Sequence, residues 1–214
     1  MRCIKSNGQF VGLAFFLLVG SGCYHPVTTM FETSESLEAG ETKVTLAGTV
    51  SPDNRDSNGG VSFTGIVDHG ISANQDIRFR VERRNERGTS SPDNYSFLEF
   101  GSKWSGNATA KNVAVALPIQ AYIPDDGDAF LIVDPRVILS TKNAEETLEV
   151  SSVFHTQFGV WDGYLGVVPG ITLGFGFGKD NAVRFDVGWS LEEQITFGFG
   201  VQFMKEKDQD PQLQ

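Results

Sequence analysis

The sequence predicts an all-β fold, an antiparallel up-and-down transmembrane β-barrel of about ten strands. From Thr42 onward apolar residues recur with a period of two, and no stretch shows a sustained helical pattern. The alternating segments are longer than the roughly 5 to 6 residues of an ordinary strand, and they approach the roughly 9 to 11 residues with which a tilted strand crosses a bilayer. The face opposite the apolar residues carries charges of both signs, which suits a narrow lumen where charges pair.

The predicted strands are separated by residues that favour turns. Ser-Pro-Asp-Asn occurs at 51–54 and 91–94, and Asp-Gly occurs at 126–127 and 162–163. The ten segments are 42–50, 60–69, 76–83, 95–104, 112–123, 129–140, 147–158, 164–177, 182–191 and 195–204. The links at 51–59 and 85–94 follow odd-numbered segments and are the longest, and in outer-membrane barrels the longer links face outward; the short link at 192–194 is an exception.

Three prolines lie inside these segments and argue against an uninterrupted barrel. Pro118, Pro135 and Pro169 each remove a backbone donor, so each requires a bulge or a strand end. If two of them mark real breaks, the strand count falls to eight or the domain is a sandwich.

The two faces of the strands differ in chemistry. In the last segment Ile195, Phe197, Phe199 and Phe203 share one face. The predicted lumen charge network on the opposite face consists of Asp76, Arg78, Arg80, Glu82, Glu99, Lys103, Asp134, Arg136, Glu149, His155, Arg184 and Asp186. The alternation also fits a soluble β-sandwich or a lipocalin-like lipoprotein, in which the apolar face turns inward to form a core or bind an apolar ligand.

The N-terminus has the layout of an export signal. Arg2 and Lys5 precede an apolar run from Phe10 to Gly20, which is too short for a transmembrane helix. The sequence Gly-Ser-Gly-Cys at 20–23 resembles the lipobox of bacterial lipoproteins, although Gly20 stands where an aliphatic residue is usual. The resemblance implies a lipoprotein signal peptide at 1–22 and a lipid on Cys23. An ordinary signal peptidase site is the alternative.

The remaining domain boundaries follow from composition. Residues 23–41 are polar and without period, so we expect a lipidated N-terminus and a flexible tether. The barrel domain spans 42–204, and 205–214 form a polar C-terminal tail. Tyr24 follows the cysteine in place of the aspartate that resembles an inner-membrane retention signal, which favours the outer membrane as the destination.

The last segment also carries a motif. Thr196, Gly198, Val201 and Phe203 resemble the C-terminal assembly signal of outer-membrane barrel proteins, although a polar tail follows Phe203 here. The signal and this strand together resemble small outer-membrane β-barrel proteins of Gram-negative bacteria, without indicating a specific family. The resemblance implies that the barrel-assembly machinery and outer-membrane lipid are partners, and that the protein is a lipid-anchored protein of the bacterial outer membrane.

No enzymatic motif stands out in the sequence. Ser151 and His155 share a face, but four residues along a strand separate them by about 13 Å, too far for a hydrogen bond. We therefore expect no enzyme, no cofactor and no metal. The net charge of -10 argues against nucleic acid as a partner. The expected role is structural or surface-interacting, with small-solute passage as a weaker possibility.

Overall fold

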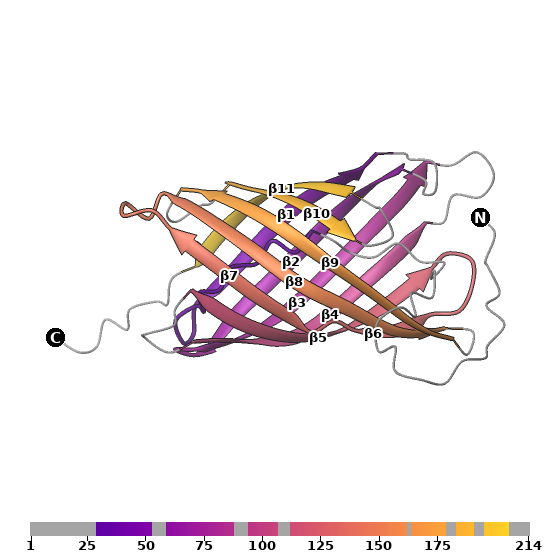
Figure 1. Ribbon diagram of the computed structural model, residues 1–214, viewed down its shortest axis with the longest axis horizontal. Helices are drawn as coiled ribbons and strands as arrows, with labels where there is room; N and C mark the ends of the chain where they lie inside the picture. Colours follow the sequence, from indigo (N-terminus) through magenta and orange to yellow (C-terminus); the bar gives the residue numbers. More distant parts are fainter. Residues whose placement is uncertain are drawn as a thin grey trace, which may run out of the picture.

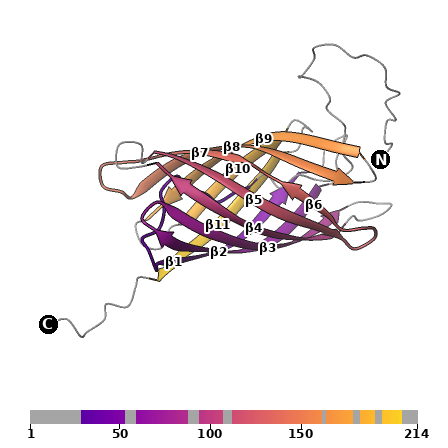
Figure 2. The same cartoon turned by 90° about the horizontal axis from the view of Figure 1, so that it is seen from below.

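The chain forms a closed antiparallel barrel (Figures 1 and 2). The computed structural model describes residues 29–52, 59–87, 94–106, 112–161, 164–178, 183–190 and 195–205. The strands are β1 (Thr42–Ser51), β2 (Gly59–Ser72), β3 (Gln75–Arg87), β4 (Tyr95–Ser105), β5 (Val113–Pro124), β6 (Phe130–Val133), β7 (Arg136–Lys142), β8 (Leu148–Trp161), β9 (Tyr164–Phe177), β10 (Val183–Ser190) and β11 (Ile195–Lys205). Consecutive strands pair in order, and β1 pairs with β11 to close the wall.

Strands β6 and β7 are two halves of one strand of the wall. β5 faces β6 at Ile119↔Val133 and β7 at Ala116↔Arg136, with the register unchanged across the break. β8 also pairs with both halves in one register. The predicted antiparallel barrel of ten strands is therefore confirmed, and the alternatives of eight strands or a sandwich do not hold.

The prolines explain the break. Asp134 donates its backbone N–H to Pro118 (3.1 Å) and Thr156 donates to Pro135 (3.2 Å). The return hydrogen bonds of these two pairs cannot form, because proline has no N–H. Pro169 costs no ladder bond between β9 and β10, since that ladder stops one residue short of it.

The barrel has an apolar outer face and a polar inner face. Side chains that point outward include Phe63, Phe100 and Leu131, which are 67%, 59% and 64% exposed. Charged side chains such as Arg80 and Asp134 are fully buried inside. The alternative of a lipocalin-like calyx, in which the apolar face turns inward, is therefore wrong. Within the described ranges, no helix is long and apolar enough to span a membrane.

The two ends of the barrel differ. We call the end where β1 begins and β11 ends the proximal end, and the other the distal end. The links after β2, β4, β7 and β9 lie at the proximal end, and those after β1, β3, β5, β8 and β10 lie at the distal end. The last described residue, Lys205, ends β11 at the proximal end.

We predict that Gly101→Ala destabilises the barrel. A Cβ at Gly101 would lie 2.5 Å from the Pro118 Cα, a backbone atom that cannot move aside. Forced overpacking of this kind costs about 1 to 3 kcal/mol, which urea unfolding followed by tryptophan fluorescence would measure. Gly65→Ala is the control, because no atom lies within 4 Å of its Cβ position. Equal loss in both variants would contradict the close approach at Pro118.

Candidate functional site

The lumen is occupied by the chain's own N-terminal residues. Thr29, Met30, Phe31, Glu32 and Ser34 are each at most 2% exposed. Residues 29–37, here called the plug segment, run through the barrel interior toward the proximal end, and residues 38–41 lead into β1. The described residues 29–37 are bound inside the barrel and do not form part of the flexible tether that the sequence predicts over 23–41. The segment lacks a hydrophobic period because its partners are charges on the wall, which a local pattern does not reveal.

The wall binds the backbone of the plug segment at every carbonyl from residue 29 to residue 35. The donors, in chain order of the carbonyls, are Arg80 to Thr29 (2.8 Å), Arg78 to Met30 (2.9 Å) and to Phe31 (3.4 Å), Arg184 to Glu32 (2.7 Å), Lys103 to Thr33 (3.2 Å), Ser105 to Ser34, and Lys103 to Glu35 (2.6 Å). Buried carbonyls need such partners in a segment that forms no strand of its own. The wall cations thus replace a hydrogen-bonded ladder.

Backbone N–H groups of the same segment donate to wall acceptors. Phe31 N donates to Asp186 (2.6 Å), Ser34 N donates to Ser140 (2.8 Å), and Leu37 N donates to Asp76 (3.0 Å). The plug segment is therefore bound through both its donors and its acceptors.

Glu32 is the ionic centre of the lumen. Its Oε1 lies 2.8 Å from Arg78 Nη1 and 2.9 Å from Arg136 Nη1. Arg78 also pairs with Asp68, and Arg136 pairs with Glu99. The two guanidinium groups offset the free-energy cost of removing the Glu32 carboxylate from water.

Two apolar side chains anchor the plug segment on either side of this centre. Met30 packs with Ala114, Ala116, Ile138 and Val153, which come from β5, β7 and β8. Such burial withdraws apolar area from water and stabilises the segment.

Phe31 fits against the glycines of β11. A Cβ at Gly198 would lie 2.6 Å from the Phe31 Cζ, and a Cβ at Gly200 would lie 3.3 Å from its ring. Phe31 itself has a φ of 51°, a left-handed conformation that bulky residues rarely adopt. The glycines thus make room for a ring that the backbone turns toward them, and the ring also packs with Ala47 and Ile66.

The predicted lumen charge network lies where the sequence placed it, with one exception. Asp76, Arg78, Arg80, Glu82, Glu99, Lys103, Asp134, Arg136, His155, Arg184 and Asp186 are all buried. Their ion pairs include Lys103–Asp76 (2.8 Å), Arg136–Asp134 (2.8 Å), Arg184–Asp186 (3.1 Å) and Arg80–Glu82. Glu149 is only half-buried, near the proximal end.

The structure adds charged residues that the predicted network omits. Lys43, Asp68, Arg84 and Glu86 are buried on the inner face, and Glu32 joins from outside the strands. Lys43 lies 3.5 Å from Asp68. The strand alternation already places the first four inward; Glu32 has no such signal.

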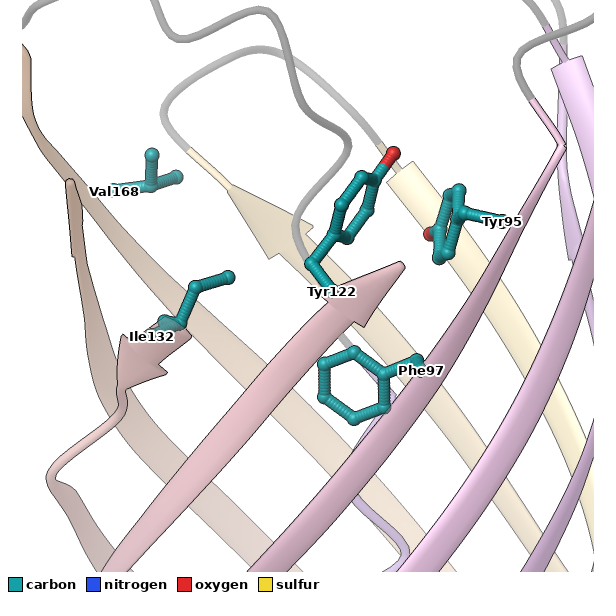
Figure 3. Close-up of a cluster of buried hydrophobic side chains, with 5 residues drawn as sticks. All are labelled: Tyr95, Phe97, Tyr122, Ile132 and Val168. Atoms are coloured by element: carbon teal, nitrogen blue, oxygen red, sulfur yellow. The ribbon is translucent and has the colours of Figure 1, made fainter. Parts of the chain in front are cut away.

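The distal half of the lumen also contains an apolar cluster, which Figure 3 shows. Tyr95, Phe97, Tyr122, Ile132 and Val168 pack together inside the wall, and the Tyr95 and Tyr122 ring centroids are 4.4 Å apart. The Arg80 guanidinium lies over the Phe97 ring, 5.6 Å from its centroid. The inner face is therefore not uniformly charged.

The structure does not bring Ser151 and His155 together. Arg184 donates to the Ser151 hydroxyl, whereas His155 Nδ1 lies 3.3 Å from Asp134 Oδ1. Among the described residues, no group of three or more histidine, cysteine or acidic side chains could hold a metal ion.

The residues of the proposed assembly signal occupy both faces of β11. Thr196 and Gly198 point inward, and the Thr196 hydroxyl lies 3.0 Å from that of Ser51. Val201 and Phe203 belong to the outer face, where Phe203 is 47% exposed. Cys23, the signal peptide at 1–22 and most of the C-terminal tail lie outside the described residues.

Comparisons with known proteins find only structural likeness. No protein-family model and no curated protein sequence matches the chain. An outer-membrane channel from Pseudomonas putida F1 is 11% identical with a TM-score of 0.48, covering 80% of this chain and 98% of that one. The KdgM porin is 9% identical with a TM-score of 0.40, covering 76% and 98% of the two chains. A barrel from the de novo design of transmembrane β-barrels is 13% identical with a TM-score of 0.40, covering 79% and 99%.

These matched structures belong to the architecture class that the sequence predicts, and no specific family is indicated. At such identities and scores the likeness carries no argument about function. The architecture of this chain is established by its own strand pairing.

We predict that Glu32→Gln loosens the plug segment. The change removes the carboxylate that Arg78 and Arg136 share, and a charge-assisted hydrogen bond contributes about 1.5 to 3 kcal/mol. Hydrogen exchange of the Phe31, Ser34 and Leu37 amides should therefore accelerate by roughly tenfold or more. The control is Glu35→Gln, because the Glu35 side chain is 58% exposed and its pair with Lys142 is a surface pair. Unchanged exchange in Glu32→Gln would show that the carboxylate does not hold the segment.

Proposed function

We propose that the protein is a lipid-anchored β-barrel of the Gram-negative outer membrane with a non-enzymatic, structural or surface-interaction role. The observation that carries this proposal is the inverted polarity of the barrel. Phenylalanines of β2, β3, β4, β10 and β11 point outward, while arginines and carboxylates fill the interior. In water, a continuous apolar belt of this kind would be covered by a partner. A bilayer can surround the whole belt, because every strand of a closed barrel pairs with two neighbours and no backbone group is left unpaired against hydrocarbon.

The occupied lumen supports a closed barrel rather than an open pore. The plug segment binds the wall through its backbone, and Glu32 joins Arg78 to Arg136 across the interior. The apolar cluster around Tyr122 fills part of the distal half. A structural or surface role needs no open path, so it agrees with this arrangement better than free solute passage does.

The plug segment also bears on the proposed lipid anchor. Six peptide steps separate Cys23 from Thr29, and they span at most about 20 Å. Thr29 lies beside Gly198, close to the distal start of β11 and far from its proximal end. A lipid on Cys23 would therefore enter the bilayer most readily at the distal end.

The expected partners follow from the same proposal. Outer-membrane lipid would contact the apolar belt, and the barrel-assembly machinery would recognise the last strand through Thr196, Gly198, Val201 and Phe203. The polar tail after β11 would then lie in the periplasm.

Adjacent residues of β2 test whether the outer face meets lipid. Phe63→Cys places a thiol on the outer face, whereas Ser62→Cys places one in the lumen, where Ser62 is fully buried. In vesicles containing the full chain, we expect a lipid-phase thiol reagent to label position 63 at least tenfold faster than position 62. Labelling of position 63 by a water-soluble reagent as fast as in the unfolded chain would overturn the proposal.

Small-solute passage is the second candidate role, and it requires that the plug segment move. This movement can be blocked reversibly at the contact between Ser36 and Ser105, whose hydroxyls lie 2.7 Å apart. Cysteines at these two positions would lie close enough for a disulfide between the segment and the wall.

We predict that the wild-type protein is silent in planar bilayers and that Met30→Ser with Phe31→Ser produces conductance steps. The double change removes both apolar anchors, and each truncation of this kind costs several kcal/mol. Adding Ser36→Cys and Ser105→Cys should suppress the steps under oxidising conditions, and a reductant should restore them. Ser36→Cys alone is the control. Silence of the anchor variant, with folding intact, would exclude passage through the lumen.

A further inference from the structure

The outer wall contains a pocket at the break between β6 and β7. Its volume is about 770 Å³, within the roughly 300 to 1,000 Å³ range of small-molecule sites. The side chains that line it include Trp104, Leu117, Val137, Phe154 and Phe158, all of which belong to the apolar outer face. The pocket is therefore continuous with the belt that faces lipid in the proposed function.

Prolines cause the opening. Pro135 and Pro169 line the pocket, and Pro135 separates β6 from β7. Because Pro135 cannot donate to Thr156, and Pro118 cannot donate to Asp134, two adjacent rungs of the wall each lack one hydrogen bond. The strands are least tightly joined where the pocket lies.

Two polar side chains form the floor of the pocket. Arg136 and His155 line it from the lumen side, and both are buried. The Arg136 side chain is held by Glu99, Asp134 and Glu32, and the His155 ring lies against Gly170, where a Cβ would be 2.4 Å from its Nε2. The floor therefore separates the pocket from the lumen.

The position of the pocket along the barrel axis determines which part of a lipid molecule can enter it. On β8 its lining residues run from Phe154 to Phe158, in the middle of a strand that spans Leu148 to Trp161. On β9 they are Pro169 and Gly170, again at mid-strand. On β4 and β5 the lining reaches Trp104 and Val115, close to the proximal ends of these strands. In a bilayer the pocket therefore extends from the hydrocarbon core, where acyl chains lie, toward the proximal interface.

We infer that this pocket binds one acyl chain of a bilayer phospholipid, held as an ordered lipid against the wall. The inference rests on the proposed function, since it needs the barrel to span a membrane. The apolar lining removes the chain from the bulk lipid without desolvating a polar group, and the ionic floor stops it from entering the lumen.

Matched valines of the outer face provide the test. Val137 lines the pocket and Val187 lies on β10, away from it; they are 44% and 38% exposed. The full chain, reconstituted in palmitoyl-oleoyl-phosphatidylcholine vesicles and released in mild detergent, is weighed by native mass spectrometry. We expect the wild type and Val187→Trp to retain one phosphatidylcholine, and Val137→Trp to retain at least tenfold less.

A second variant closes the pocket in another way. Pro135→Ala restores an N–H opposite Thr156, so the rung can close and lipid retention should fall at least threefold without loss of thermal stability. Equal retention by Val137→Trp and Val187→Trp would overturn the inference. Vesicle flotation measures membrane insertion independently of lipid retention. A wild-type protein that inserts but retains no lipid contradicts this inference alone. A wild-type protein that does not insert contradicts the proposed function.

Discussion

The contact of Glu32 with Arg78 and Arg136 is the interaction on which the interior depends. Arg184 adds a hydrogen bond to the Glu32 carbonyl, so one residue of the plug segment is held by β3, β7 and β10. These strands are three, three and four positions apart around the ring of ten. Glu32 is thus bound from three well-separated directions. Charges buried in a narrow lumen cost several kcal/mol each unless they are paired, so this carboxylate stabilises the wall as much as the wall stabilises the segment.

The same contact explains the shape of the surrounding lumen. With Glu32 at the centre, Phe31 must turn toward β11, and only glycine at positions 198 and 200 leaves room for its ring. Met30 then reaches the alanines of β5 on another side. Moving the segment out would take away the Glu32 carboxylate and the backbone carbonyls that Arg78, Arg80 and Arg184 bind, so any opened state must admit water to replace these contacts.

The sequence predicts the strands of the barrel wall, but it does not predict the plug segment or the aromatic cluster inside. The period of two identifies ten strands because each residue of a closed wall faces either outward or inward, and the charges of Arg78, Asp134 and Arg184 fall inward by the same count. The plug segment follows no period, since it is bound through its carbonyls by side chains more than forty residues away in sequence. The inward glycines of β11 were a hint that something bulky lies opposite. The aromatic cluster around Tyr122 escaped prediction because inward apolar residues break the simple division of the two faces.

The proline seam and the plug segment are physically linked through Arg136. It is the first residue of β7, directly after the proline that interrupts the wall, and its side chain reaches Glu32, Glu99 and Asp134 inside. Where the ladder lacks backbone hydrogen bonds, these ionic contacts join the start of β7 to β4 through Glu99 and to the plug segment through Glu32. Weakening the bond to Glu32 therefore removes support from the part of the wall that has the fewest backbone bonds. The same side chain lines the outer pocket, so one residue contacts both the plug segment and the floor of that pocket.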